Sequence, residues 1–154
     1  MRKQYVGYAA FAKRSFEEVF DKNMLQGAVH RQAETFASTY FENLGNGNFK
    51  AVPLPSQAQV APIHAFLPGD FDGDGKMDAL AVGNFYGNQP FTGRSDALYG
   101  LLLNGDGAGN FTSVDSGFFT TGECRDVKLL KGTNGKQWVV VARNNDSVLF
   151  FEKK

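Results

Sequence analysis

Four aspartates stand close together in one short, glycine-rich segment, Gly69 to Asp78. They occupy positions 1, 3, 5 and 9 of the loop that starts at the first of them: Asp70, Asp72, Asp74 and Asp78. Alternate side chains converge when a loop wraps around a cation, and calcium accepts six to eight oxygen ligands at flexible angles. The spacing therefore predicts one calcium site, formed by these four carboxylates and the main-chain carbonyl of Lys76 at position 7. Gly75 permits the sharp turn after position 5.

Four carboxylates within nine residues repel one another unless a cation neutralises them. We therefore expect metal binding and local folding of the loop to be coupled. Magnesium is less suited, because it demands a stricter octahedron and releases water reluctantly. A solvated acidic turn is the simpler alternative, but asparagine–glycine turns need no such density of carboxylates. An EF-hand needs an acidic residue at position 12, and Ala81 stands there in an apolar run.

Other groups that could do chemistry are sparse. Neither of the two histidines adjoins a recognisable nucleophile motif, and the alternating pattern around His64 favours a packed or hydrogen-bonded residue in a strand. Cys124 is the single cysteine, which excludes an internal disulfide and a cysteine-rich zinc site. Nothing in the sequence fixes a separation suited to glycoside cleavage for the remaining acidic candidates, Asp115, Glu123 and Asp126. We expect no enzyme.

Composition sets further bounds. The 16 basic and 16 acidic residues cancel, so no overall field favours nucleic acid or anionic membranes as partners. No apolar run approaches the roughly 20 residues that a transmembrane helix needs. Charged residues interrupt any apolar core of an export signal near the N-terminus, so we expect a soluble chain without one. The 18 glycines and 15 phenylalanines are typical of short strands joined by tight turns.

Residues 1–30 differ from the rest and predict a helical segment. Aromatic and apolar residues recur there at intervals of three and four: Tyr5, Tyr8, Phe11, Ala12, Phe16, Val19 and Phe20. Ser15 and Glu18 have the spacing of a capping box, which predicts a first helix ending near Lys13 and a second beginning at Phe16. We expect the aromatic stripe to dock on the adjacent sheet, with a membrane or partner helix as the alternative.

Residues 31–154 predict a mainly β region. Short runs rich in β-branched and aromatic residues alternate there with turns of glycine, asparagine and aspartate. The predicted strands are 37–43, 63–67, 79–84, 98–104, 111–114, 127–130, 138–142 and 148–152.

An internal repeat organises these strands. The surroundings of Phe49 return around Phe111, and those of Asn84 return around Asn144. Both pairs give nearly the same period, which indicates one repeated structural unit. Such a unit predicts antiparallel four-stranded blades that bury their faces against neighbouring blades.

The chain would contain a half blade (35–55), a full blade with the calcium loop (60–119) and a degenerate blade (124–154). A closed propeller needs at least four blades, so about two and a half make an incomplete one.

The degenerate blade lacks the acidic ligands. At the offset between Asn84 and Asn144, the four aspartates become Leu130, Gly132, Asn134 and Trp138. We therefore predict one Ca²⁺ per chain.

A long segment inside the full blade, 84–96, is a candidate for partner binding. Four of its residues are typical recognition anchors: Phe85, Tyr86, Phe91 and Arg94. The alternative is a loop folded over its own blade.

The aspartate loop, the apolar strand after it and the segment Leu103–Phe111 together resemble the FG-GAP/VCBS repeat. The resemblance spans roughly 35–150 and is strongest over 66–111. It implies an integrin-α-like β-propeller in which calcium binds between the first two strands of a blade. Residues 60–119 are also similar to the C-terminal end of bacterial surface proteins related to the cartilage acidic protein family.

This resemblance implies a non-enzymatic, calcium-stabilised segment of an extracellular or cell-surface protein that serves in binding or adhesion. Its ligand would be a protein or a carbohydrate. The alternative is a propeller that presents substrate within a larger carbohydrate-active or other extracellular enzyme. Open blade edges would pair with further blades of a longer parent chain or with other copies of the chain.

Overall fold

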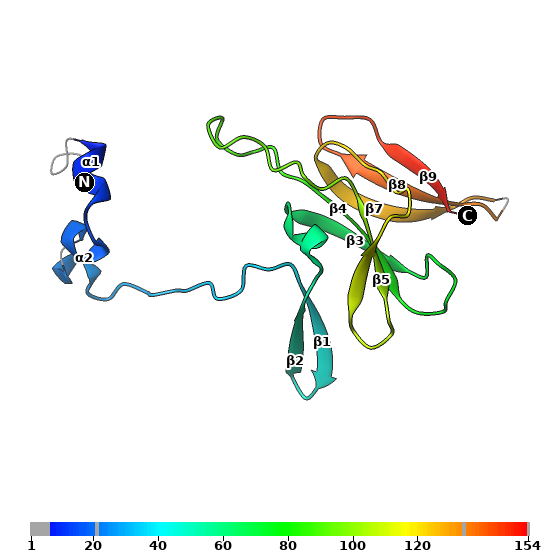
Figure 1. The fold of residues 1–154 in the computed structure, drawn as a ribbon, viewed down its shortest axis with the longest axis horizontal. Helices are drawn as coiled ribbons and strands as arrows, with labels where there is room; N and C mark the ends of the chain where they lie inside the picture. The colour runs from blue at the N-terminus through cyan, green and yellow to red at the C-terminus, as the bar shows by residue number, and fades with distance from the viewer. Residues whose placement is uncertain (1–6, 21, 134, 154) are drawn as a thin grey trace. The chain divides into compact units, whose positions relative to one another are not determined.

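The computed structural model describes residues 7–20, 22–133 and 135–153 (Figure 1). The chain divides into two compact units, Met1–Phe36 and Ala37–Lys154, slightly beyond the boundary at residue 30 that composition predicts. Tyr5 of the predicted stripe and Asn134 of the degenerate loop lie outside the described residues.

The described part of the first unit contains α1 (Tyr8–Ala12), α2 (Phe16–Val19) and the 3₁₀ turn η1 (Lys22–Leu25). The predicted capping box is confirmed, because the Glu18 amide donates to Ser15 Oγ and the Ser15 amide donates to Glu18 Oε2 at 2.9 Å. The side chains of Tyr8, Phe11 and Phe16 are exposed. Docking of this stripe on a sheet stays a prediction.

The described residues of the second unit form three antiparallel sheets, which confirms a mainly β protein. The first sheet pairs β1 (Thr39–Gly45) with β2 (Asn48–Pro53). The middle sheet has the order β3 (Ile63–Gly69), β4 (Asp78–Gly83), β5 (Leu101–Gly105), β6 (Phe111–Val114). The third sheet has the order β7 (Cys124–Lys131), β8 (Gln137–Arg143), β9 (Leu149–Lys153). A short 3₁₀ turn, η2 (Ser56–Gln59), leads from the first sheet towards the middle one. Within the described ranges the sheets do not close into a ring.

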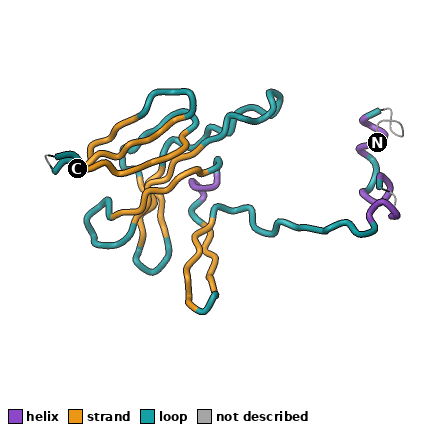
Figure 2. Tube along the Cα trace, turned by 180° about the vertical axis from the view of Figure 1, so that it is seen from behind, coloured by secondary structure: helices purple, strands orange, loops and turns teal. Residues whose placement is uncertain are grey.

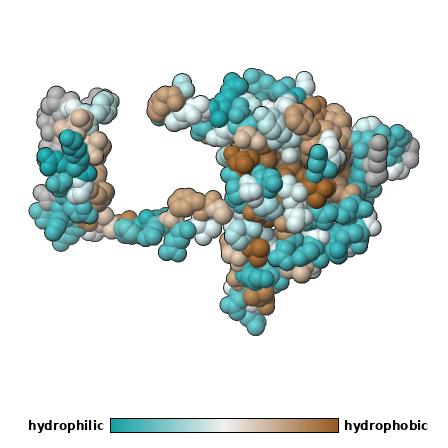
Figure 3. Space-filling view, viewed as in Figure 1, coloured by the Kyte–Doolittle hydropathy of each residue, from teal (hydrophilic) through white to brown (hydrophobic). Residues whose placement is uncertain are grey.

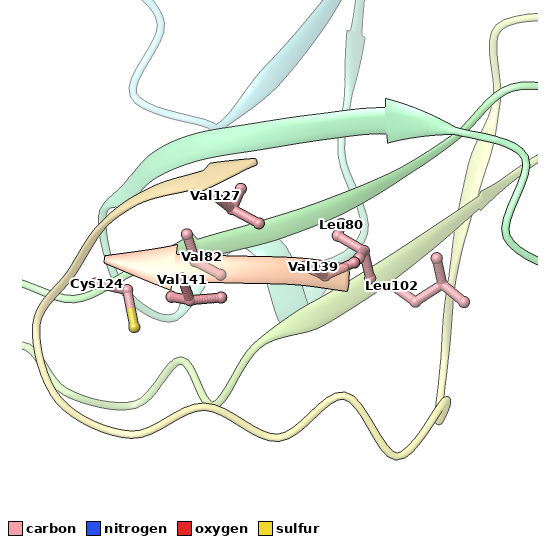
Figure 4. Packing of buried hydrophobic residues seen from close by; sticks show 7 residues of the cluster. All are labelled: Leu80, Val82, Leu102, Cys124, Val127, Val139 and Val141. Atoms are coloured by element: carbon pink, nitrogen blue, oxygen red, sulfur yellow. The ribbon is translucent and has the colours of Figure 1, made fainter. Parts of the chain in front are cut away.

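Strand β4 lies in the centre of this unit and is buried on both faces. Its alternating side chains enter two different cores: Ala81 belongs to the cluster with Leu101 and Leu103, whereas Leu80 and Val82 pack against the third sheet. The apolar run at 79–82 therefore follows from burial on two sides. Figure 4 shows the second cluster, in which Val127, Val139 and Val141 of the third sheet meet Leu80, Val82 and Leu102 of the middle one.

The predicted strand at 98–104 begins too early. β5 starts only at Leu101, because the buried amide of Leu98 donates to the side-chain oxygen of Asn84 instead of to a neighbouring strand. Gly100 then adopts a positive φ of 83°, which breaks the extended run before the strand begins. The long connection between β4 and β5 runs out from the sheets and returns beside itself (Figure 2).

The two-sided burial of the middle sheet gives a first prediction. Leu103→Ala should lower the free energy of unfolding by about 2–5 kcal/mol, because it removes a fully buried side chain and leaves a cavity. Leu44→Ala, the same change at an exposed position of β1, is the matched control and should cost far less. Urea denaturation followed by circular dichroism measures both. Equal losses would contradict the assignment of the core.

Candidate metal centre

Three of the four predicted aspartates come together in the loop between β3 and β4. One carboxylate oxygen each of Asp70, Asp72 and Asp78 lies within 4.8 Å of the others. Among the described residues this is the one such group of three or more acidic, histidine or cysteine side chains. The predicted spacing therefore brings three carboxylates to one point in space.

The loop is shaped by its own side chains. The carboxylate of Asp70 accepts hydrogen bonds from the amides of Gly73 at 2.6 Å and Gly75 at 3.0 Å. Both glycines have a positive φ, 82° and 80°, which other residues adopt with difficulty. The first aspartate thus folds the following five residues back over itself.

Asp78, the first residue of β4, is completely buried and ties the loop to the sheet. One of its carboxylate oxygens accepts from the amide of Phe71 and the other from the amide of Gly105 in β5, both at 2.9 Å. A side chain at position 105 would collide with the carbonyl of Met77, so only glycine brings this amide so near. Buried carboxylates need such partners, because desolvation of the charge is otherwise costly.

Asp72 makes the second link to β5. Its carboxylate accepts from the side-chain amide of Asn104 at 2.6 Å and from the amide of Asp74 at 3.0 Å. Two adjacent residues at the end of β5, Asn104 and Gly105, therefore hold two of the three clustered carboxylates.

Asp74 points elsewhere in this structure. Its carboxylate accepts from the amide and from the Nζ of Lys76, both at 2.8 Å. The bonds from Lys76 lower the pKa of Asp74, and the bond to Asp74 in turn raises the pKa of Lys76. The ion pair is partly exposed, so its net contribution to stability is small. The ligand roles of Asp74 and of the Lys76 carbonyl stay predictions.

A residue far along the chain also reaches the loop. Lys153 in β9 donates from Nζ to the main-chain carbonyl of Asp70 at 2.6 Å and lies over the ring of Phe71, 4.9 Å from its centroid. Sequence reasoning missed Asn104, Gly105 and Lys153, because none belongs to the loop. The repeat pattern around Asn104 gave a partial signal, whereas nothing in the sequence pointed to Lys153.

The chemistry of this donor set suits a hard cation. Each carboxylate offers about four acceptor positions, so the hydrogen bonds above leave lone pairs free on all three. The clustered donors are oxygens only, which favours calcium, magnesium or manganese over zinc or copper. The residues present therefore fit a divalent cation of that class.

The opposite end of β4 carries a polar cluster with structural partners. The buried side chain of Asn84 donates to the carbonyls of Leu98 and Gly122 and accepts from the Leu98 amide. His64 is exposed, and its Nε2 lies 2.8 Å from the Asn84 carbonyl oxygen, so it is hydrogen-bonded rather than packed in the core. Cys124 is buried, and burial raises the pKa of its thiol.

Glu123 belongs to the same cluster and is only 2% exposed. Its carboxylate accepts from the side-chain amide of Asn144 at 2.6 Å and from the main-chain amide of Tyr86 at 3.1 Å, and it pairs with Arg125. These contacts, the Asn144 bond foremost, lower the pKa of Glu123. Glu123 thus joins the third sheet to the base of the 84–96 segment.

The 84–96 segment itself forms a projecting hairpin. Phe85 and Ser95 exchange two main-chain hydrogen bonds at 2.8 and 2.9 Å, and the guanidinium of Arg94 lies 4.4 Å from the centroid of the Tyr86 ring. Phe91, beyond this paired region, is 84% exposed. The structure therefore brings Tyr86 and Arg94 together and places Phe91 separately, in solvent.

Comparison with known families places this site in a repeat of known type. Residues 64–98 match the family model of the FG-GAP repeat. The match includes the aspartate loop, β4 and the hairpin. No curated protein and no solved structure matches the chain. No helix among the described residues is long and apolar enough to cross a membrane.

The buried position of Asp78 gives a second prediction. With chelator present, Asp78→Asn should lower the free energy of unfolding by about 1–3 kcal/mol, because an amide cannot accept both main-chain hydrogen bonds. Asp72→Asn makes the same change on an exposed side chain and should cost less, because water can replace a lost hydrogen-bond partner there. Urea denaturation of both variants tests this. A larger loss for Asp72→Asn would contradict it.

A third prediction concerns pH. Because the folded pKa of Glu123 lies below its ordinary value of 4.5, its contribution to stability is present above that value and is lost as pH falls through the lowered pKa. Glu123→Gln should therefore lower stability at neutral pH and lessen the fall in stability under acid. Urea midpoints from neutral to acid pH give the difference, with exposed Glu152→Gln as control. Parallel curves for the Glu123 variant and the parent protein would refute the role.

Proposed function

Because residues 64–98 match the FG-GAP repeat, we propose that this chain is a calcium-stabilised, non-enzymatic propeller segment of an extracellular or cell-surface binding protein. One observation carries the metal assignment: the carboxylates of Asp70, Asp72 and Asp78 converge to within 4.8 Å. Asp74 and the carbonyl of Lys76 complete the proposed ligand set. Asp74 would leave its ion pair with Lys76 when the cation binds.

Calcium is the cation that the loop suits best. Its carboxylates come from one glycine-rich loop rather than from several elements, and calcium tolerates irregular coordination. Magnesium would demand closer and more regular oxygens. A divalent charge would also relieve the repulsion among three carboxylates that share one small volume.

The proposed role of the ion is structural. Asp72 and Asp78 are already bonded to Asn104 and Gly105 at the end of β5, so an ion bound to them would fasten the β3–β4 loop to that strand. The Lys153 contact extends the connection to β9 of the third sheet. The sheets would then behave as blades that the ion braces at one end.

A location outside the cell is consistent with such a site. Extracellular calcium modules bind with dissociation constants of about 10⁻⁴–10⁻³ M, a range suited to millimolar calcium. In the proposal, a loop whose five protein ligands all come from one short segment belongs to this weaker class.

The hairpin at 84–96 is the proposed recognition element. Its base is held by Asn84 and Glu123, while Phe91 offers an aromatic side chain to solvent. Rigid support with an exposed aromatic anchor is the arrangement in which a few residues dominate binding energy. Tyr86 and Arg94, stacked on each other, provide a second, polar contact for a protein or carbohydrate ligand.

Thermal unfolding with calcium, with magnesium and with chelator tests the proposal. Calcium at about 100 times its dissociation constant should stabilise the parent protein by about 2.7 kcal/mol. The double variant Asp72→Ala with Asp74→Ala should show no such rise in midpoint. The double variant Asp96→Ala with Asp115→Ala removes the same charge from two exposed carboxylates outside the loop and should respond like the parent.

An unfolding midpoint of the parent protein that is the same in calcium and in chelator would contradict the metal assignment. An equal rise in the loop variant would show that calcium acts elsewhere on the chain. A rise with magnesium as large as with calcium would contradict the choice of metal.

A further inference from the structure

The middle sheet is covered on both faces, by the third sheet on one and by Tyr40 of the first sheet, Leu54 and Ala58 on the other. Its β4 and β5 side chains alternate between the cluster shared with the first sheet and the cluster shared with the third. The first and third sheets each keep one outer face that no described part of this unit covers.

The outer face of the third sheet, here called the back face, is apolar at its centre. It consists of four side chains that alternate with the buried valines of the same strands: Leu130, Trp138, Val140 and Phe150. Leu130 is 53% and Phe150 58% exposed, and together with Trp138 they line a shallow hollow. Brown, hydrophobic residues are visible at the surface over the strands of this sheet (Figure 3).

Ion pairs border the back face instead of interrupting it. Lys136 and Glu152 pair at 2.6 Å, and Lys128 and Asp126 pair at 2.8 Å. An apolar centre with a polar rim is the usual anatomy of a surface that binds another protein.

The outer face of the first sheet, here called the front face, is also aromatic. Phe41 and Phe49 are 58% and 60% exposed, whereas Tyr40, the neighbour of Phe41, turns inward and packs edge-on against Phe111 of the middle sheet. Two large side chains that a packed sheet would bury are thus left in water.

The internal repeat relates the front and back faces to the two buried faces of the middle sheet. When the third sheet is aligned on the middle one by the repeat, Val140 of the back face is the counterpart of Leu80, which is buried against the third sheet. When the first sheet is aligned in the same way, Phe41 of the front face is the counterpart of Leu103, which is buried in the cluster shared with the first sheet. The front and back faces therefore repeat the two opposite faces of the middle sheet, both of which are covered within this unit.

We propose that copies of this chain associate head to tail, with the back face of one copy receiving the front face of the next. Such a contact would continue the packing that already covers both faces of the middle sheet. Because the two faces differ, the interface is heterologous, so each copy keeps one face for a further neighbour until a ring closes. This proposal is independent of calcium binding and concerns surfaces away from the aspartate loop.

Light scattering coupled to size exclusion, over a concentration series, tests the association. The parent chain should show masses that are multiples of 16.9 kDa and rise with concentration. A back-face variant, Leu130→Glu with Phe150→Glu, and a front-face variant, Phe41→Glu with Phe49→Glu, should each be monomeric. Phe119→Glu, which changes a comparably exposed aromatic (61%) on neither face, is the control and should associate like the parent.

Mixing the two variants gives the sharpest result. The back-face variant keeps an intact front and the front-face variant an intact back, so the mixture should form a one-to-one dimer that neither forms alone. Serine in place of glutamate at the same positions provides milder variants, and circular dichroism verifies that each is folded. A parent chain that stays monomeric, or a mixture of folded variants that stays monomeric, would overturn the proposal. Continued association of either variant alone would do the same.

Discussion

The buried carboxylate of Asp78 is the interaction on which the arrangement of this repeat depends. It stands where β4 begins, and its two oxygens are shared between the loop before it and the strand beside it. A charge so deep in a β-sheet is tolerated only when both oxygens are hydrogen-bonded, so the loop and β5 are obliged to approach together. The glycine at 105 and the close packing against the Met77 carbonyl follow from that requirement.

The polar side chains at the two ends of β4 are hydrogen-bonded in different ways. At the aspartate end, main-chain amides and a side-chain amide surround negative charge that is only partly neutralised within the chain. At the Asn84 end, donors and acceptors are matched, since one amide side chain serves two carbonyls and one N–H group. One end is thus suited to an additional cation, and the other is complete as it stands.

The sequence was most informative where partners are close along the chain. Spacing alone predicted the convergence of Asp70, Asp72 and Asp78, and the Ser15–Glu18 pair correctly predicted the start of α2. Contacts between distant segments were beyond such reasoning, because no local pattern encodes that Asn104 meets Asp72 or that Asn84 replaces a strand partner for Leu98. Spacing also did not predict that Asp74 would point away from the other three carboxylates, where it pairs with Lys76 two residues further on.

The contact between Lys153 and Asp70 has a consequence for the order of folding. The strand pairs that form each sheet join segments near each other in the chain, whereas this contact closes a loop between residues 83 positions apart. Closing so long a loop carries a larger entropic cost than closing a hairpin, so it follows the local pairings that shorten the distance. We therefore expect the aspartate loop to receive this last partner only after β9 has joined β8.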